Sequence, residues 1–329
     1  MAKKIITWII VPFMIIVFVL DIATVVLCNK NCARFAIEKE DFSEKNGNDK
    51  IHFLNTSNSD AVLIESNGRF ALVDAGEGGE NPRRKNEYPD FSKTVISYLK
   101  KTAGDEHGKV HLDFVLCTHY HYDHSGGFHS LFSDEDITVG TAYMKEYDPS
   151  VGKPYEPYKW GLQGIYDEII RDINLRGFDL VQSLPDKPFA LGDFTVLFFN
   201  TVTPENAAGR GENAACVGVK LTKGEKSAFL AADITASTGL EQELKDSIGK
   251  VELLKIGHHG YYGSSSRPFV KVLRPEISIV TNRLGKIYPN VKWNLTMTVR
   301  SAIFATFDND GIIASFKDGG EIVLTNHIH

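Results

Sequence analysis

Cysteine is scarce in this sequence, which has four among its 329 residues: Cys28, Cys32, Cys117 and Cys216. Their spacing matches neither a zinc-finger pattern nor the disulfide framework of a small secreted domain. Internal repeats and low-complexity tracts are also missing, and 43% of the residues are hydrophobic against 24% charged. These values exclude a disordered or collagen-like chain, and they indicate one large folded domain or two ordinary ones.

An excess of positive charge is absent as well. The chain has 36 Lys and Arg against 42 Asp and Glu, which gives a formal net charge of −6. Proteins that bind nucleic acid without regard to sequence need a basic face. The charge balance therefore predicts no stable nucleic-acid partner, although it is compatible with a local basic groove. Nothing in the sequence indicates an oligomeric state.

One long apolar run is present, at the N-terminus. Lys3 and Lys4 precede it, and it extends from Ile5 to Leu20, is interrupted by Asp21 and resumes from Ile22 to Cys28. A membrane span needs about 20 apolar residues. The run reaches that length only if Asp21 is tolerated, and a carboxylate costs less near the end of a span than at its centre.

Residues 1–28 can therefore be a membrane anchor, through residues 5–28, or a signal peptide. No small-x-small cleavage site follows the run, which favours the uncleaved anchor. Both interpretations place the rest of the chain outside the cytoplasm, either membrane-anchored or secreted; a buried core helix is a less favoured third. The polar residues 29–49 are expected to form a linker, and residues 50–329 the folded domain.

From residue 51 onward, short strand-like segments alternate with helical periods. The helical period appears in residues 93–101, 164–176 and 296–307. The strand candidates are short, apolar or β-branched, and bounded by Gly, Asp or Asn. They are residues 51–54, 61–65, 70–73, 114–118, 137–143, 194–199, 216–221, 228–232, 253–256, 277–280, 312–315 and 321–324. This order predicts an α/β fold of the layered α+β kind, with two packed sheets covered by helices.

Three histidines and an aspartate fall within six positions, directly after the strand predicted at residues 114–118: His119, His121, Asp123 and His124. Alternate residues of an extended segment point the same way. His119 and His121 can therefore share one metal ion, while Asp123 and His124 turn towards a second. Imidazole and carboxylate are ligands of zinc-class ions. The sequence thus predicts two divalent metal ions, Zn²⁺ or Mn²⁺.

Other apolar strands also end in residues that suit such a site. Asp233 follows one of them, where a carboxylate is unfavourable unless it is paired or metal-bound, and it is the natural bridging ligand. Asp74 follows another and can orient a histidine. His258 and His259 follow a third. Of these two, His258 is predicted to bind metal and His259 to contact the substrate, an order that the sequence alone leaves open.

The residue order Asp74, His119-x-His121-x-Asp123-His124, Asp233 and His258 resembles the ordered motifs of the metallo-β-lactamase superfamily, over residues 51 to about 325. The resemblance implies an αββα sandwich with a binuclear site at one edge of the sheets. The family usually has a further histidine between the cluster and the bridging aspartate. The corresponding stretch, residues 211–216, has none, which implies that one metal ion has fewer protein ligands.

The missing histidine and the run His258-His259-Gly260, followed by residues 264–266, resemble a particular subgroup. It includes the hydrolase domain of competence-type DNA-uptake membrane proteins and the teichoic-acid phosphorylcholine esterases of Gram-positive bacteria. Both cleave phosphodiesters, so the resemblance implies a metal-dependent hydrolase in which a bridging hydroxide attacks a phosphodiester.

The predicted substrate is a small molecule or a polymer: a phosphorylcholine-type headgroup, a cell-wall polymer or nucleic acid. Asp123, His259 and Asp74 are the residues expected to act in catalysis. Two alternatives remain open from the sequence, a lactone or thioester hydrolase and a metal-binding sensing module without catalysis.

Overall fold

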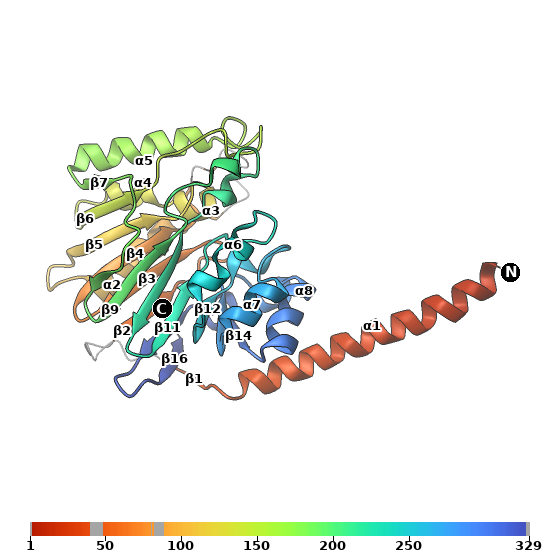
Figure 1. Ribbon diagram of the computed structural model, residues 1–329. Coiled ribbons are helices and arrows are strands. Elements are labelled where there is room, and N and C mark those ends of the chain that lie inside the picture. The colour runs from red at the N-terminus through yellow and green to blue at the C-terminus, as the bar shows by residue number, and fades with distance from the viewer. Residues whose placement is uncertain (1, 40–48, 80, 82–88, 327–329) are drawn as a thin grey trace.

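Two mixed β-sheets face each other at the centre of the molecule, and a long N-terminal helix projects from one side (Figure 1). This computed structural model describes residues 2–39, 49–79, 81 and 89–326. The first sheet contains, from edge to edge, β1 (Ile37–Lys39), β16 (Ile322–Asn326), β15 (Ile312–Phe316), β2 (Asp49–Phe53), β3 (Ala61–Ser66), β4 (Arg69–Ala75), β5 (Val110–Cys117), β6 (Ile137–Met144) and β7 (Asp179–Val181). The second contains β14 (Ala302–Ala305), β13 (Ile277–Val280), β12 (Leu253–Lys255), β11 (Lys226–Leu230), β10 (Gly218–Lys223), β9 (Phe194–Phe199) and β8 (Phe189–Leu191).

Helices cover the outer face of each sheet. Those on the first sheet are α2 (Ser92–Ala103), α4 (Phe128–Ser133) and α5 (Leu162–Arg176), and those on the second are α6 (Leu240–Ile248) and α7 (Arg267–Leu273). The remaining helices are α1 (Ala2–Cys32), α3 (Tyr122–Ser125) and α8 (Pro289–Trp293). Short turns of other helical type are η1 (Glu205–Ala207), η2 (Glu212–Ala214), η3 (Gly257–Gly260), η4 (Leu284–Lys286), η5 (Asn294–Thr298) and η6 (Phe307–Asn309).

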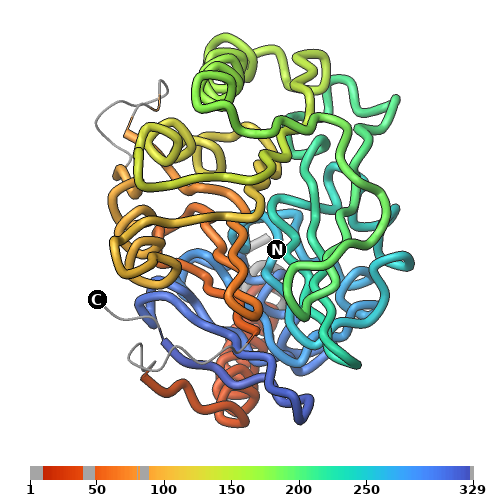
Figure 2. Tube along the Cα trace, turned by 90° about the vertical axis from the view of Figure 1, so that its left-hand side faces the viewer, coloured from red at the N-terminus to blue at the C-terminus, as the bar shows by residue number. Residues whose placement is uncertain are grey.

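The layers follow from where the apolar side chains point. In β5, Phe114 and Leu116 pack into the core between the sheets, whereas Val115 and Cys117 pack against the helices outside. A strand buried on both faces needs such a continuous apolar run. Figure 2 shows the two halves side by side, with β3 to β6 in orange and yellow on one side and the green to light-blue strands of the second sheet on the other; the dark-blue β15 and β16 belong to the first sheet. The predicted layered αββα sandwich is thus confirmed.

One predicted helix is wrong. Residues 296–307 place Val299, Ile303 and Phe304 at helical spacing, but only Asn294–Thr298 forms a wide helical turn, and Ala302–Ala305 is strand β14. That strand pairs in parallel with β13. A short apolar run fits either the helical or the strand period, and here pairing with β13 favours the strand.

The predicted linker is partly regular structure. Helix α1 continues to Cys32, β1 occupies Ile37–Lys39, and β2 already begins at Asp49; residues 40–48 lie outside the described residues. β1 pairs in parallel with β16. The segment that follows the apolar run is therefore attached to the first sheet, and the predicted domain boundary at residue 50 lies inside β2.

Helix α1 is long and apolar enough to cross a membrane. Within the described residues, Ile10–Cys32 has a mean hydropathy of 2.8 and is 6% buried. Large apolar side chains are exposed along the helix as far as Val26. Length and composition thus fit either a membrane anchor or a signal sequence.

Candidate metal centre

The turns that follow several apolar strands meet at one edge of the two sheets. β4 and β5 run in parallel in the first sheet, and β11 and β12 run in parallel in the second. Parallel neighbours bring their carboxyl ends to the same edge. This arrangement gathers Asp74, the segment 119–124, Asp233 and the pair His258-His259 at a single site.

The backbone around the site has an unusual conformation. Asp74, Ala232, His258 and His259 all have positive φ, between 41° and 58°. Such angles are uncommon for residues other than glycine and tend to occur at functional sites, where surrounding structure holds them. In η3 the two positive-φ residues are adjacent, so the neighbouring imidazoles point in different directions.

A first group of ligand atoms is formed by His119, His121 and Asp233. His119 Nε2 lies 3.2 Å from His121 Nδ1 and 3.7 Å from Asp233 Oδ2. The other ring nitrogen of His119, Nδ1, lies 3.1 Å from the hydroxyl of Thr118. Three ligand atoms that converge so closely can hold one cation.

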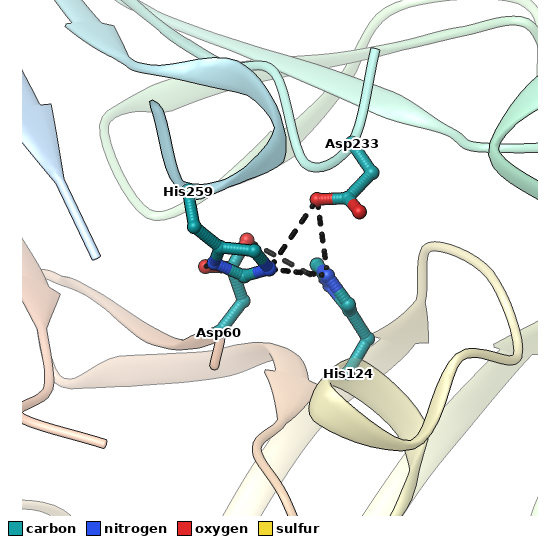
Figure 3. A group of neighbouring side chains, drawn as sticks. All are labelled: Asp60, His124, Asp233 and His259. Atoms are coloured by element: carbon teal, nitrogen blue, oxygen red, sulfur yellow. Dashed lines mark hydrogen bonds and ion pairs between the residues drawn. The ribbon is translucent and has the colours of Figure 1, made fainter. Parts of the chain in front are cut away.

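A second group contains Asp60, His124, Asp233 and His259, all buried (Figure 3). His124 Nε2 lies 3.1 Å from Asp233 Oδ1 and 3.2 Å from His259 Nε2. Asp123 joins them, with Oδ2 3.3 Å from His259 Nε2. The two groups thus use different oxygens of Asp233, which is the arrangement of a ligand that bridges two cations.

In the second group, buried hydrogen-bond acceptors contact Nδ1 of His124 and of His259, the ring nitrogen on the side away from the shared ligand atoms. Asp74 Oδ2 lies 2.7 Å from His124 Nδ1. His259 Nδ1 lies 3.1 Å from the hydroxyl of Thr281 and 3.3 Å from Asp60 Oδ1. The Thr281 hydroxyl donates to the same Asp60 oxygen, so Thr281 accepts at His259. A proton at Nδ1 leaves the lone pair at Nε2, facing the site.

These contacts show that the residues fit metal ions. With both Nδ1 atoms donating, the Nε2 lone pairs of His124 and His259 face each other at 3.2 Å, a repulsive contact unless a positive charge lies between them. The carboxylates around the site also indicate that it fits metal ions. Lys255 forms an ion pair with Asp60, which leaves Asp74, Asp123 and Asp233 facing histidines. Buried carboxylates require compensating charge.

The same charges shift proton affinities. Burial opposes protonation of His259, but the Asp60 and Asp233 carboxylates outweigh it and raise the His259 pKa to about 9. Burial likewise opposes protonation of His124, and Asp233 and Asp74 raise its pKa well above the usual 6.5. Burial opposes ionisation of Asp233, yet nearby His124 holds its pKa well below the usual range. The site thus favours positive charge at the histidines, which bound cations would supply.

The two adjacent histidines are placed differently from the sequence-based expectation. His259, expected to contact the substrate, is 1% exposed and lies within the second group. His258, expected to bind metal, is 32% exposed at its side chain, with Nε2 3.8 Å from Asp233 Oδ2. That oxygen belongs to the first group, so His258 lies at the open side of the centre.

Several residues near the centre were not predicted. Asp60 contacts His259 and is itself bound by Thr281 and Lys255. Residue type alone did not indicate a role for these three residues, because Asp60 is distant in sequence from its partners. Glu156 Oε1 lies 3.7 Å from His121 Nε2. Glu212, in the stretch where the family histidine is missing, accepts from the backbone of Tyr120, and burial raises its pKa to about 7.

Comparison with known proteins identifies the fold family. The family model of the metallo-beta-lactamase superfamily matches residues 54–204, which include β3, β4 and the whole segment 119–124. Together with the two-sheet architecture, this match shows that the chain has the metallo-beta-lactamase fold with a candidate His/Asp metal site, and it supports placement in that superfamily.

Two curated proteins are similar at low identity. "Recombination protein 2" of Haemophilus influenzae is 21% identical over 239 residues, which cover 71% of this chain and 24% of that protein. "ComE operon protein 3" of Bacillus subtilis is 26% identical over 226 residues, 67% of this chain and 25% of that protein. The chain therefore spans about a quarter of the length of the curated relatives it matches.

Among solved structures, the metallo-beta-lactamase fold protein YhfI from Bacillus subtilis is similar at a TM-score of 0.49 and 14% identity. The superposition covers 81% of this chain and 98% of that one.

Proposed function

We propose that this protein is a hydrolase that binds two divalent cations, Zn²⁺ or Mn²⁺, and cleaves a phosphodiester. The observation that carries the proposal is the sharing of Asp233, whose two oxygens face two separate groups of histidine nitrogens. When bound, such cations lower the pKa of water to about 7 and offset negative charge on a substrate oxygen.

Different residues of the site would have different roles in binding the two cations and the substrate. His119, His121 and Asp233 would hold one cation, and Asp123, His124, His259 and Asp233 the other. Asp74 and Asp60 fix the Nδ1 protons of His124 and His259, which keeps each Nε2 available as a ligand. We assign His259 to the metal and His258 to the substrate, the reverse of the order expected from the sequence, because only His258 is accessible.

The phosphodiester substrate is supported by the residue pattern rather than by a bound ligand. The stretch 211–216 has no histidine, and the pair His258-His259 lies in the turn after β12, as in the phosphodiesterase subgroup that the sequence resembles. Candidate substrates are a phosphorylcholine-type headgroup and a cell-wall polymer or nucleic acid. A lactone or thioester hydrolase of the same fold is the alternative.

The test is a substrate panel with the full chain in detergent, loaded with Zn²⁺ or Mn²⁺. We expect turnover of phosphodiesters, including phosphorylcholine esters, and none above background with lactones or thioesters. Asp123→Asn should abolish turnover, because it removes a ligand; the matched exposed control Asp186→Asn should retain it. Turnover of lactones or thioesters alone would identify the alternative function, and metal binding without any turnover would indicate a sensing module.

We further propose that residues 5–28 anchor the protein in a membrane, with the metal centre on the extracytoplasmic side. The proposal is supported by the apolar helix and by Lys3 and Lys4 before it. Protease added to intact cells should degrade the domain, and carbonate should leave the chain in the membrane. Protection from protease would reverse the orientation, and release by carbonate would indicate a cleaved signal peptide or peripheral binding.

A further inference from the structure

The membrane-proximal end of α1 is fixed to the folded part. Asn31 Nδ2 donates to the carbonyl of Thr296 at 3.4 Å and to that of Ser301 at 3.3 Å. Cys32 Sγ donates to the carbonyl of Ile303 at 3.3 Å, and Cys28 is 1% exposed. These contacts join the last turns of the helix to η5 and β14. The direction in which α1 leaves the domain is therefore set by side-chain packing.

A groove of about 500 Å³ lies where α1 leaves this contact, between the helix and residues 284–293. The apolar residues Val17, Leu20 and Val25 line its helix side together with Asp21 and Thr24, and Leu284, Ile287 and Trp293 line the other side. A volume of this size suits a small ligand. Along the helix, residues 17 to 25 span about 12 Å, since each residue rises about 1.5 Å.

The groove continues the exposed apolar surface of α1. Val17 and Leu20 are each 41% exposed and Val25 is 48% exposed, and the large apolar side chains from Ile10 to Ile16 are between 46% and 64% exposed. A helix with this surface must bury it against lipid or protein. Because the groove opens along the same surface, whatever surrounds the helix also fills the groove.

Side chains next to the residues that line the groove have the composition of a membrane interface. Tyr288 is 44% exposed and Tyr262 is 70% exposed, with their rings 6.0 Å apart. Lys286 is exposed on the same segment, and Lys292 lines the groove. Tyrosines and basic side chains at the end of an apolar span are typical of the headgroup level. The cations also complement the phosphate of an anionic lipid.

We propose that the groove between α1 and residues 284–293 holds an acyl chain of a membrane phospholipid and so seats the folded part on the bilayer. The groove segment is attached to the metal centre: the backbone N–H of Tyr288 donates to the carbonyl of Gly260 at 2.9 Å. The Tyr261 ring lies 6.4 Å from Tyr288 and 5.7 Å from His258. If the proposed function also holds, this chain of contacts places phosphodiesters of the membrane surface within reach of the site.

Tryptophan quenching by brominated lipid tests the contact directly. The chain has three tryptophans, Trp8, Trp160 and Trp293. The full chain with Trp8→Phe and Trp160→Phe is placed in phosphatidylcholine–phosphatidylglycerol vesicles brominated near the headgroup end of the acyl chain. In this variant Trp293 is the only tryptophan, and it should be quenched. The control is the chain with Trp8→Phe and Trp293→Phe, in which Trp160 is the only tryptophan. Trp160 should not be quenched, because it lies against His121.

A groove-filling substitution tests the site. Gly285 lines the groove, and a Cβ there meets no atom within 4 Å, so a side chain can be added without a clash at Cβ, and we expect the ring of Gly285→Phe to fill part of the groove. Gly164 on α5 has equal space, which makes Gly164→Phe the matched control. Cross-linking of a photoactivatable acyl chain to residues 284–293 should fall about tenfold in Gly285→Phe, since the ring displaces a few methylenes, and should be unchanged in Gly164→Phe.

Equal quenching of Trp293 and Trp160, or lipid cross-linking that Gly285→Phe leaves unchanged, would overturn the proposal. Cross-links between two chains at the groove, in place of lipid, would assign it to a second copy and also overturn it. None of these measurements depends on turnover. Lipid contact in a chain without activity would therefore support the groove and count against the proposed function.

Discussion

His258 and His259 are neighbours in sequence, yet they have different surroundings. Both have a φ of 50°, which turns their side chains apart. His259 points inward, with Asp60 on one ring nitrogen and Asp123 on the other. His258 points to the open side. The preference for His258 as the ligand rested on its position after the strand, and the backbone conformation that separates the two rings is not readable from residue types.

His259→Gln should remove one of the two bound metal ions, and His258→Gln should leave both. The first substitution deletes an inward-facing ligand atom, and the second deletes an accessible side chain. The measurement is metal content per chain after dialysis against limiting Zn²⁺, with exposed His111→Gln as control. Loss of metal from His258→Gln with full content in His259→Gln would restore the sequence-based order.

Glu241 is a buried acid away from the metal centre. It is 1% exposed; Oε2 accepts the backbone N–H of Ser266 at 2.9 Å, and Oε1 has no hydrogen-bond partner among the described residues. Burial raises its pKa from the usual 4.5 to about 7. The folded state thus holds this proton more tightly than the unfolded state, so stability falls as pH rises from the unfolded to the folded pKa.

Glu241→Gln should therefore stabilise the protein near pH 8 and have little effect near pH 5. The difference between the two pKa values corresponds to a penalty on the order of 3 kcal/mol in the wild type above pH 7. Urea unfolding at both pH values measures it. Glu225→Gln, at an exposed turn, is the control and should change neither value. A Glu241→Gln effect that is the same at both pH values would contradict the assignment.

Among the elements, close backbone contacts hold the turn that carries the candidate metal ligands against β4. A Cβ on Gly127 would lie 2.1 Å from the carbonyl oxygen of Ala75, and one on Gly78 would lie 2.0 Å from that of Gly126. Real side chains cannot approach backbone so closely. Gly127, after the histidine cluster, and Gly78, after β4, therefore allow α3 and α4 to approach the end of β4.

Gly127→Ala should lower the free energy of unfolding by about 1–3 kcal/mol, because rigid backbone must move to admit the methyl group. Gly164→Ala should have the opposite sign, with a gain of about 0.5–1 kcal/mol, since the position is helical and open. Thermal unfolding of both variants gives the comparison. A Gly127→Ala protein as stable as the wild type would mean that the two segments are not packed as described.

Local patterns predicted the elements better than they predicted contacts between distant segments. Residues 119–124 lie in one turn, so their spacing already indicated a metal site. Asp60 is different: its partners Lys255 and Thr281 are 195 and 221 residues away. Only the stacking of the two sheets brings them together, and no periodicity reports it. The strand at Ala302–Ala305 was missed for a related reason, because its partner β13 decides its conformation.

At the scale of the whole molecule, bound metal should contribute to stability. Three carboxylates converge on histidines, those of Asp74 and Asp233 buried and that of Asp123 partly exposed, and removal of cations leaves their charge poorly compensated. At a free metal concentration of about 100 times Kd, linkage supplies about 2.7 kcal/mol. Chelation should therefore lower Tm in calorimetry, and Asp233→Asn should lose this metal dependence. An unchanged Tm after verified removal of metal would show that the site is stable without it.

The first sheet is assembled from both ends of the chain. Ile37 of β1 lies opposite Leu324 of β16, and Phe53 of β2 opposite Ile312 of β15. During synthesis, β1 and one edge of β2 stay unpaired until β15 and β16 have been translated. Pairings over such long separations are slow to form. An anchored N-terminus would keep the waiting strands at the membrane surface, where unpaired edges invite association with other chains. Completion of the domain thus depends on the timing of translation as well as on its sequence.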